Sequence, residues 1–299
     1  MSQTILLPTL RQLRFLVTLA EEGNFSRAAE VCSVTQPTLS AAIKELEATL
    51  GVILVERGAR GAALTPAGEA AVERAYTTLA EAEDLVQAAR AAGEPLSGPF
   101  RLGVIPTIAP FLLPRLLPVV SAAHEKLQLY LREDLTARLL EGLRARTLDA
   151  ALIALPYDAP GIESVAVGGD EFLFAAAPHH RLAQQSSISP RDLDDEKLLM
   201  LEDGHCLRDH ALAVCSASAT RTDFAATSLH TLAQMVKSGL GATLLPRLAV
   251  EGGVADGLGL DVKPFTPAVI GREIGIAWRK GSAREAEARL IAGVVEGLL

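Results

Sequence analysis

The apolar residues of the first fifty positions recur at intervals of three and four, the period of a helix with one buried face. This pattern predicts a first helix over residues 10–19, a short second helix with Ser26 as its N-cap, and a third helix that opens at Thr35 or Gln36 with Pro37 in its first turn. Two short helices joined by a tight turn are typical of a helix-turn-helix.

The outer face of the third predicted helix carries small polar side chains and a lysine, namely Gln36, Thr38, Ser40 and Lys44. Such groups can reach base edges or phosphates, and the free N–H groups of a first helical turn favour phosphate oxygens. An ordinary surface helix with a polar face is the alternative. Residues 51–68 favour DNA binding, because they predict a two-stranded wing with Arg57 and Arg60 at its tip.

Residues 25–57 resemble the helix-turn-helix pattern of LysR-type transcriptional regulators. The matching residues are Phe25, Ala28, Ala29, Thr35, Gln36, Pro37, Thr38, Leu39, Ser40, Ile43, Leu46, Glu47, Leu50, Gly51, Leu54 and Arg57. Cys32 and Val55 depart from the leucine and phenylalanine that are usual there, and both changes keep an apolar side chain. The resemblance implies contacts with double-stranded operator DNA from Ser33, Thr35, Gln36, Pro37, Thr38, Ser40, Lys44, Arg57 and Arg60.

A longer helix is predicted from Thr65–Pro66 to about Arg90. Its apolar residues at helical spacing are Val72, Tyr76, Leu79, Ala82, Val86 and Ala89. A stripe of this kind on a charged, alanine-rich helix is typical of a dimer seam, and packing onto its own domain is the alternative. The glycines and prolines of residues 93–99 then break the helix and predict a hinge.

Beyond the hinge, strand-like and helical runs alternate, which is the pattern of a parallel α/β sheet. The predicted runs of the first half are 100–105, 112–121, 127–131, 135–146 and 150–155, and a strand over 273–278 is expected to return to that half. The resemblance to LysR-type effector domains, which are similar to periplasmic binding proteins, covers this region too and implies two α/β lobes around a cleft.

The predicted fold is therefore α+β and multidomain. Its parts are a winged helix-turn-helix DNA-binding domain over residues 1–65, a dimerisation helix over 66–91, a hinge over 92–99 and a redox-sensing effector domain over 100–299. Within the effector domain, lobe I covers about 100–167 and 270–299, and lobe II covers about 168–269.

Net charge changes this picture only in one respect. The 299 residues carry a net charge of −8, which does not by itself suggest a nucleic-acid partner. Residues 1–65 hold six basic and six acidic side chains, so contacts with DNA must come from a few placed groups rather than from a broad basic face.

The composition also bears on the cell compartment. No apolar signal segment follows a basic start, and no run of residues approaches the roughly 18 apolar residues that a membrane span needs. We therefore expect a cytoplasmic protein without membrane contact. In that compartment a disulfide between any of the three cysteines is transient or sensing rather than structural.

The stretch from Glu202 to His210 is the most unusual part of the sequence, because seven of its nine residues are charged, histidine or glycine. His205 and Arg208 favour a thiolate at Cys206, the reactive form of the side chain, while the nearby carboxylates oppose it. If the residues from Cys206 to Cys215 are helical, their Cα atoms lie about 13 Å apart, whereas a disulfide needs about 7 Å or less. A bond between them would have to remake the segment, which is the behaviour of a switch.

Two other interpretations of the cysteines stay open. A free cysteine is most often a small buried hydrophobic residue, and we adopt that reading for Cys32 but not for Cys206, whose neighbours are polar. A metal site would use His205, Cys206, His210 and Cys215, but their spacing does not match the usual zinc patterns. We therefore predict no metal and no other cofactor.

Residues 201–209, the cysteine nine residues after Cys206, and the segments 105–107, 226–229 and 241–246 resemble the OxyR branch of the LysR family, the hydrogen-peroxide sensors. The resemblance implies that Cys206 is the peroxidatic cysteine and Cys215 the resolving one. It implies a peroxide site made of Thr107, Thr136, His205, Arg208, Asp209 and Arg272. The segment after Cys215 is shorter than in relatives, and Asp223 takes the place of a histidine there, which affects the rate of disulfide formation.

The prediction for function is a peroxide-responsive activator of oxidative-stress genes that binds DNA as a homotetramer, a dimer of dimers. RNA polymerase and a thiol reductant such as glutaredoxin are the expected further partners. The alternative is a LysR-type regulator that answers a small organic effector while its cysteines stay inert. A thiol peroxidase is a third reading, but catalytic turnover needs no helix-turn-helix, so we predict no enzyme.

Overall fold

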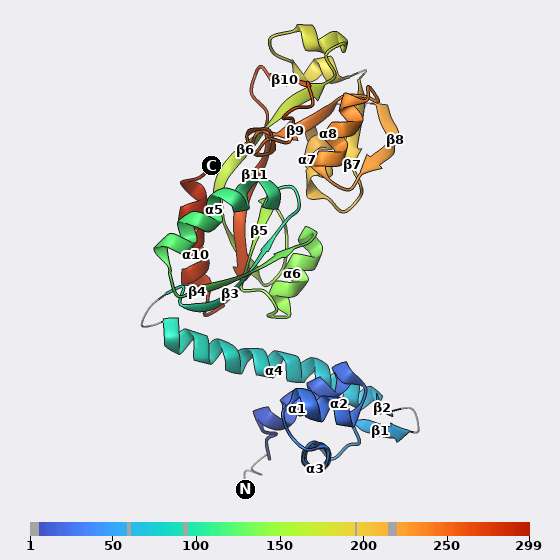
Figure 1. Cartoon of the computed structure of the whole chain (residues 1–299), viewed down its shortest axis with the longest axis vertical. Helices are drawn as coiled ribbons and strands as arrows, with labels where there is room; N and C mark the ends of the chain where they lie inside the picture. The colour runs from blue at the N-terminus through green and yellow to red at the C-terminus, as the bar shows by residue number, and fades with distance from the viewer. Residues whose placement is uncertain (1–5, 59–60, 92–94, 195, 215–219) are drawn as a thin grey trace. The chain divides into compact units, whose positions relative to one another are not determined.

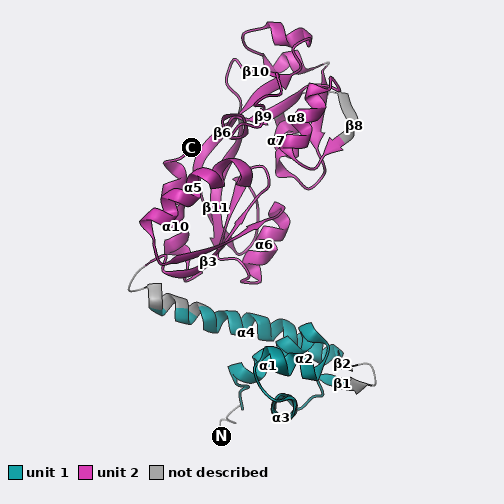
Figure 2. Ribbon diagram, viewed as in Figure 1, with its two compact units in different colours: residues 1–89 teal, residues 90–299 magenta. Residues whose placement is uncertain are grey.

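The computed structural model describes residues 6–58, 61–91, 95–194, 196–214 and 220–299. Two compact units divide the chain after residue 89 (Figure 2). The predicted fold class is confirmed, because a winged helix-turn-helix unit is followed by a two-lobed α/β unit. Within the described ranges, no helix combines the length and the apolar character that crossing a membrane requires.

The first unit consists of three helices, a hairpin and a long helix: α1 (Leu10–Glu22), α2 (Phe25–Val31), α3 (Gln36–Leu50), β1 (Val55–Gly58), β2 (Gly61–Leu64) and α4 (Pro66–Ala91) (Figure 1). The antiparallel strands β1 and β2 form the predicted wing. Leu16, Leu39 and Leu46 are fully buried where α1, α2 and α3 pack together. The apolar periodicity of the sequence therefore marks the core of this unit.

The predicted N-cap of the second helix is wrong. Asn24 caps α2, and its side-chain oxygen accepts hydrogen bonds from the N–H groups of Ser26 and Arg27. Helix α2 begins at Phe25, so Ser26 already lies in the first turn. Asparagine and serine are about equally good N-caps, which is why the sequence alone did not separate them.

The wing is attached to the third helix by one side chain. Glu47 Oε1 of α3 accepts hydrogen bonds from the N–H groups of Leu54, at 2.9 Å, and Val55, at 3.1 Å. The start of α4 also presses against this corner, because a Cβ at Gly68 would lie 2.1 Å from the carbonyl oxygen of Leu54. Only glycine fits at position 68, and the close approach fixes where the long helix leaves the wing.

The apolar stripe of α4 has two different environments. Val72 and Leu79 pack against the core of their own unit, which was the alternative to a dimer seam. Further along, Leu85 is 71% exposed and Val86 is 47% exposed. The far half of the helix therefore keeps an uncovered apolar surface, and the seam stays a prediction for that half.

Lobe I of the second unit is built from β3 (Gly98–Val104), α5 (Ala109–Ala123), β4 (Leu127–Glu133), α6 (Thr136–Arg144), β5 (Ala150–Leu155), β11 (Ile270–Arg279) and α10 (Glu285–Glu296). Strands β4, β3 and β5 are parallel neighbours, as predicted. The returning strand β11 joins this sheet antiparallel to β5. Helices α5 and α10 cover one face of the sheet and α6 the other (Figure 1).

Lobe II contains β6 (Ile162–Ala176), the 3-10 turns Arg181–Gln184 and Pro190–Leu193, β7 (Lys197–Leu201), α7 (Cys206–Val214), β8 (Thr220–Ala226), α8 (Leu229–Lys237), β9 (Thr243–Pro246), α9 (Arg247–Glu251) and β10 (Asp261–Pro264). The long strands β6 and β11 pair antiparallel and belong to both lobes (Figure 1). Strands β9 and β10 extend β6 antiparallel, whereas β7 and β8 form a separate parallel pair. The sheet is thus mixed rather than parallel throughout.

The chain enters β3 through a strained segment held by a buried ion pair. Leu96 has a positive φ of 55°, which is unfavourable for a leucine, and its N–H donates to Glu287 Oε1 at 2.8 Å. Arg284 lies with its Nε 2.8 Å from Glu287 Oε2 and donates to the carbonyl of Pro99 at 2.8 Å. These contacts tie the start of lobe I to helix α10.

Candidate functional site

Three chain segments meet beside Cys206. Thr107 follows β3, Thr136 follows the neighbouring parallel strand β4, and Cys206 is the first residue of α7. The carboxyl ends of parallel strands and the first turns of the helices after them are where α/β proteins bind ligands. The free N–H groups of a first helical turn also face any anionic group placed there. The predicted residues Thr107, Thr136 and Cys206 therefore come together from distant parts of the sequence.

The side chain of Thr136 lies directly against the sulfur. Its Oγ1 donates to Cys206 Sγ at 3.7 Å, and Thr136 is only 3% exposed. The cap positions of α5 and α6 are Ile108 and Leu135, neither with a side-chain cap bond. Neither threonine hydroxyl is therefore used for helix capping.

A small cavity opens between these groups. It is lined by Ile105, Pro106, Thr107, Leu135, Thr136, Gly204, His205 and Cys206. The centre of a water-sized molecule can occupy about 10 Å³ of it, which is close to the minimum that one water needs. Gly204 has φ +97° and a Cβ there would lie 3.4 Å from Leu135 Cδ1, so a bulkier residue would narrow the pocket further. The cavity therefore has about the size that one water molecule needs.

Thr107 is held from behind by a buried arginine. Arg272 NH1 donates to Thr107 Oγ1 at 2.6 Å and NH2 donates to the Thr107 carbonyl at 3.0 Å. The Nε and NH2 groups of Arg272 also donate to Asp170 Oδ2 at 2.9 and 2.8 Å. The sequence did not predict a role for Asp170. The structure shows that it is the cross-strand partner of Arg272 between β6 and β11. Arg272 itself does not line the cavity but positions a residue that does.

Two histidines of the motif are partly buried, and burial lowers the pKa of both. His205 lines the cavity, and its pKa is lowered by desolvation, with a smaller opposing effect from Glu202. His210 lies one turn after Cys206 on α7, and its pKa is lowered by desolvation and by the charge of Arg272, against Asp209. The Nδ1 atom of His210 is buried and has no hydrogen-bond partner among the described residues.

Arg208 and Asp209, the other two predicted site residues, lie outside the cavity lining. Arg208 donates to the carbonyl of Leu201 at 3.2 Å and pairs with Asp203 at 3.2 Å. These contacts fasten the first turn of α7 to the end of β7 and to the loop that follows it. Asp209 is exposed on the same turn. The position of Arg208 suits a residue that holds the loop before Cys206 rather than one that touches a ligand.

The remaining cysteines differ in how far the structure describes them. Cys215, the predicted resolving cysteine, lies outside the described residues, as does the segment that follows it to residue 219. Cys32 is a free, half-buried cysteine that packs against the core of the first unit. Cys32 thus behaves as the apolar residue that was predicted.

Comparison with known families identifies both units. Residues 10–69 match the bacterial regulatory helix-turn-helix of the lysR family, and residues 93–298 match the LysR substrate binding domain. The chain belongs to the LysR family of transcriptional regulators. The predicted family is therefore confirmed over nearly the whole sequence.

Relatives within the LysR family include OxyR proteins. The DNA-binding transcriptional dual regulator OxyR of Escherichia coli K12 is 44% identical over 243 residues, which is 81% of this chain and 80% of that one. The HTH-type transcriptional regulator EstR of Acinetobacter baylyi is 46% identical over 247 residues, or 82% of each chain. A cysteine-to-serine variant of OxyR from Corynebacterium glutamicum, solved with bound H₂O₂, superposes with a TM-score of 0.68 at 36% identity, covering 98% of this chain and 93% of that one.

The LysR-family DNA-binding helix presents the predicted residues to solvent. Thr35, Gln36, Pro37, Thr38 and Lys44 are exposed, Ser33 is exposed in the preceding turn, and Ser40 is half-buried. Thr35 caps α3, and its Oγ1 lies 2.7 Å from that of Thr38. The side chain of Arg57 and all of Arg60 lie outside the described residues. The described part of the predicted DNA surface is therefore accessible at the start of α3.

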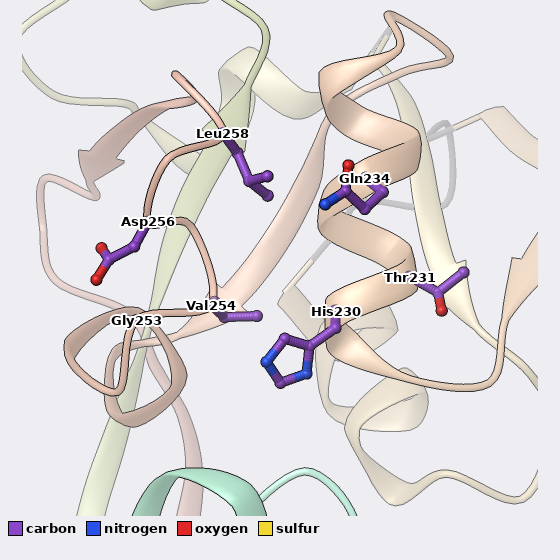
Figure 3. Close-up of a pocket in the computed structure, with 7 residues that line it drawn as sticks. All are labelled: His230, Thr231, Gln234, Gly253, Val254, Asp256 and Leu258. Carbon is purple, nitrogen blue, oxygen red and sulfur yellow. The ribbon is translucent and has the colours of Figure 1, made fainter.

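A larger cavity lies elsewhere in the LysR-type effector domain. Its volume is about 270 Å³, near the lower end for pockets that bind small molecules. It is lined by His230, Thr231, Gln234, Gly253, Val254, Asp256 and Leu258 (Figure 3). His230 and Gln234 project from α8 toward Val254 and Leu258 (Figure 3), and the His230 ring stacks on Phe111 with centroids 5.5 Å apart. No sequence signal marked this cavity.

Proposed function

We propose that this LysR-family regulator responds to hydrogen peroxide through Cys206. The observation that carries the proposal is the hydrogen bond from Thr136 to the Cys206 sulfur inside a cavity of about the size of water. Hydrogen peroxide is a small molecule that both donates and accepts hydrogen bonds, as threonine hydroxyls do. The OxyR relatives support the same reading.

The first chemical step is attack of the Cys206 thiolate on one oxygen of hydrogen peroxide. A sulfur–oxygen bond forms, the oxygen–oxygen bond breaks, and the second oxygen leaves as hydroxide, which takes a proton to become water. Sulfur is oxidised to sulfenic acid and peroxide is reduced. Hydroxyl donors beside the sulfur help, because they stabilise the charge that develops on the departing oxygen. We assign this role to Thr107, whereas Thr136, which has a single hydrogen to donate, gives it to the sulfur and stabilises the thiolate.

The second step is condensation of the Cys206 sulfenic acid with the Cys215 thiol, which forms a disulfide and releases water. Residues Cys206–Val214 are helical, and nine helical residues span about 13 Å. A disulfide, which needs Cα atoms within about 7 Å, therefore requires α7 to unwind. We infer that this unwinding is the conformational signal, and that a thiol reductant such as glutaredoxin reverses it.

The output is transcription regulation by a dimer of dimers. In each dimer, two α3 helices enter the major groove at half-sites about one helical turn apart. Ser33, Thr35, Gln36, Pro37, Thr38, Ser40 and Lys44 contact the operator from α3 and its turn, with Arg57 and Arg60 on the wing. Activation of oxidative-stress genes through RNA polymerase completes the proposal.

Counting thiols tests the proposal directly. The chain has three cysteines, and one equivalent of peroxide should leave only one free thiol in the reduced wild type. Cys215→Ser should accumulate a sulfenic acid that reacts with dimedone, whereas Cys206→Ser should not. Cys32→Ser is the matched control and should lose both remaining thiols at the wild-type rate. A Cys206→Ser protein that still changes conformation with peroxide would refute the assignment.

A second candidate function is supported by the larger cavity. At about 270 Å³, lined by His230, Gln234 and Leu258 among others, it suits a small organic effector. In that case the cysteines stay inert. The thiol titration separates the two functions, because an organic-effector regulator would keep all three thiols at one equivalent of peroxide.

A further inference from the structure

We propose that Asp170 is a positioning residue for the reaction at Cys206, because it holds Arg272 in the orientation that makes the Thr107 hydroxyl a donor toward the pocket. This inference rests on the proposed function. It concerns a residue that neither contacts the cavity nor belongs to the segment around Cys206. Asp170 would act on the chemistry through two intervening side chains.

The contacts between Asp170 and Arg272 leave the guanidinium little freedom. Two nitrogens of Arg272 donate to Asp170 Oδ2, and the two other contacts of the guanidinium go to Thr107. Asp170 is 3% exposed, Arg272 2% and Thr107 2%. Water therefore cannot replace the carboxylate as the partner of Arg272. The planar fork of an arginine transmits the position of one partner to the other.

The direction of the Thr107 hydroxyl follows from simple counting. A threonine hydroxyl has one hydrogen to donate and can accept two hydrogen bonds, while a guanidinium can only donate. Arg272 therefore occupies an acceptor site of Thr107 Oγ1 at 2.6 Å. The hydroxyl hydrogen must point elsewhere, and Thr107 lines the cavity with Cys206. Thr107 becomes a donor to whatever oxygen lies beside the sulfur.

Asp170 also reaches lobe II. Its Oδ1 accepts the N–H of Leu248 at 3.0 Å, in the first turn of α9, where Pro246 provides no side-chain cap. The Oδ2 atom of Asp170 thus accepts from Arg272, which holds Thr107 in lobe I. The Oδ1 atom accepts from the first turn of α9 in lobe II. An asparagine has a single acceptor oxygen for these two sets of donors, so Asp170→Asn must lose one of them.

The test is the second-order rate of sulfenic acid formation at Cys206, measured with the reduced full-length chain. Asp170→Asn should slow this rate by at least about tenfold, less than the roughly 10²–10³ expected for loss of a donor itself. Glu171→Gln is the matched control, because Glu171 is the next residue and pairs with the partly exposed Arg247 at 2.5 Å. Glu171→Gln should react at the wild-type rate.

A double-mutant cycle separates positioning from a merely structural role. In a Thr107→Val background, Asp170→Asn should cause almost no further loss of rate, because the hydroxyl through which Asp170 acts is gone. The effect of Asp170→Asn on the midpoint of thermal unfolding should persist in that background. If Asp170→Asn does not fold, Arg272→Lys replaces it in the same cycle, since lysine keeps the charge but loses the fork.

The outcomes distinguish this inference from the proposed function. A wild-type chain whose Cys206 does not react with peroxide would overturn both. A reactive wild type with an Asp170→Asn rate equal to that of Glu171→Gln would overturn only the role of Asp170. The role of Asp170 would also be overturned if Asp170→Asn slowed sulfenic acid formation by the same factor in the wild-type and Thr107→Val backgrounds. Its effect on the rate would then not pass through Thr107.

Discussion

The effector domain contains two buried arginine–carboxylate pairs, Asp170–Arg272 and Arg284–Glu287, which perform different tasks. All four side chains are at most 3% exposed. Arg272 donates two hydrogen bonds to Asp170 and two to Thr107, so its charge is connected to the pocket beside Cys206. Arg284 lies close to Glu287 without a directed hydrogen bond between them, and its donor goes to the carbonyl of Pro99.

The difference shows that burial alone does not mark a functional charge. Buried ion pairs are weak evidence for net stabilisation, because desolvation offsets the attraction. What separates the two pairs is the third partner. For Arg272 it is a hydroxyl that lines a cavity, and for Glu287 it is the N–H of Leu96, a residue with unfavourable positive φ. The first pair holds a residue of the pocket beside Cys206, and the second holds the chain in a strained path.

The largest expected effect is on the structural pair. Arg284→Ala leaves Glu287 buried without its cation, and breaking one partner of a buried pair typically costs about 3–5 kcal/mol. We expect a loss of this size in urea unfolding of the effector domain, with an unchanged rate of Cys206 oxidation in the folded fraction. A variant as stable as the wild type, or one that folds normally but reacts slowly, would remove the distinction between the two pairs.

The second-largest expected effect is on the rate at which Cys206 reacts with peroxide. Thr107→Val removes the hydroxyl but keeps the shape of the side chain, and losing one such donor at the oxyanion site of an enzyme costs about 10²–10³ in rate. We expect a drop toward that size in the second-order rate with peroxide. Thr231→Val is a control that also removes a hydroxyl in the effector domain, in the other cavity. A wild-type rate for Thr107→Val would show that Arg272 has no link to the chemistry.

The sequence predicted one member of the Asp170–Arg272 pair as a site residue. It predicted neither member of the Arg284–Glu287 pair. Arg272 was predicted from a family resemblance, but its partner Asp170 lies 102 residues away in a strand whose register no local pattern specifies. The register sets which residues face each other across β6 and β11, and it includes a shift between Ile270 and Arg272. Long-range pairing of this kind follows from the assembled sheet and not from composition or period.

Helices were easier to predict where the spacing of apolar residues alone determines their position. The apolar spacing located α1 and α3, and Pro37 in the first turn marked the start of α3. At α2 two good capping residues stood close together, and Asn24 proved to be the cap instead of Ser26. The site residues Thr107 and Thr136 were predicted from the family resemblance, and the structure places both after strands that are parallel neighbours.

The smallest expected effect concerns the titratable neighbours of the two pairs. His210 is the group on α7 that feels the charge of Arg272, and Asp209 acts on it with the opposite sign. Asp170, hydrogen-bonded to Arg272, is the carboxylate on the facing strand. Burial raises the pKa of Glu287, by contrast, and the carboxylate of Asp149 is a further nearby charge that raises it. Alongside burial, the functional pair therefore lowers the pKa of a neighbouring histidine, whereas the further charge that acts on Glu287 is a carboxylate.

The sign of the pH dependence follows from the direction of the shift. Burial and Arg272 hold the pKa of His210 below its usual 6.5 in the folded state. Between that lowered value and 6.5 the unfolded chain binds more protons, so stability rises with pH in this window and falls on acidification. The slope from a single group cannot exceed about 1.4 kcal/mol per pH unit. His205 adds a dependence of the same sign, because its pKa is also lowered.

His210→Gln should flatten this dependence without abolishing it. Glutamine keeps a polar side chain at the position but cannot take up a proton, so only the contribution of His205 among the two histidines remains. The measurement is urea unfolding of the reduced chain at pH 5.5, 6.5 and 7.5, with His124→Gln, on the exposed end of α5, as the control for a histidine lost elsewhere. A His210→Gln slope equal to that of the wild type would mean that His210 is not held neutral beside Arg272, and the two ion pairs would then differ only in their hydrogen bonds.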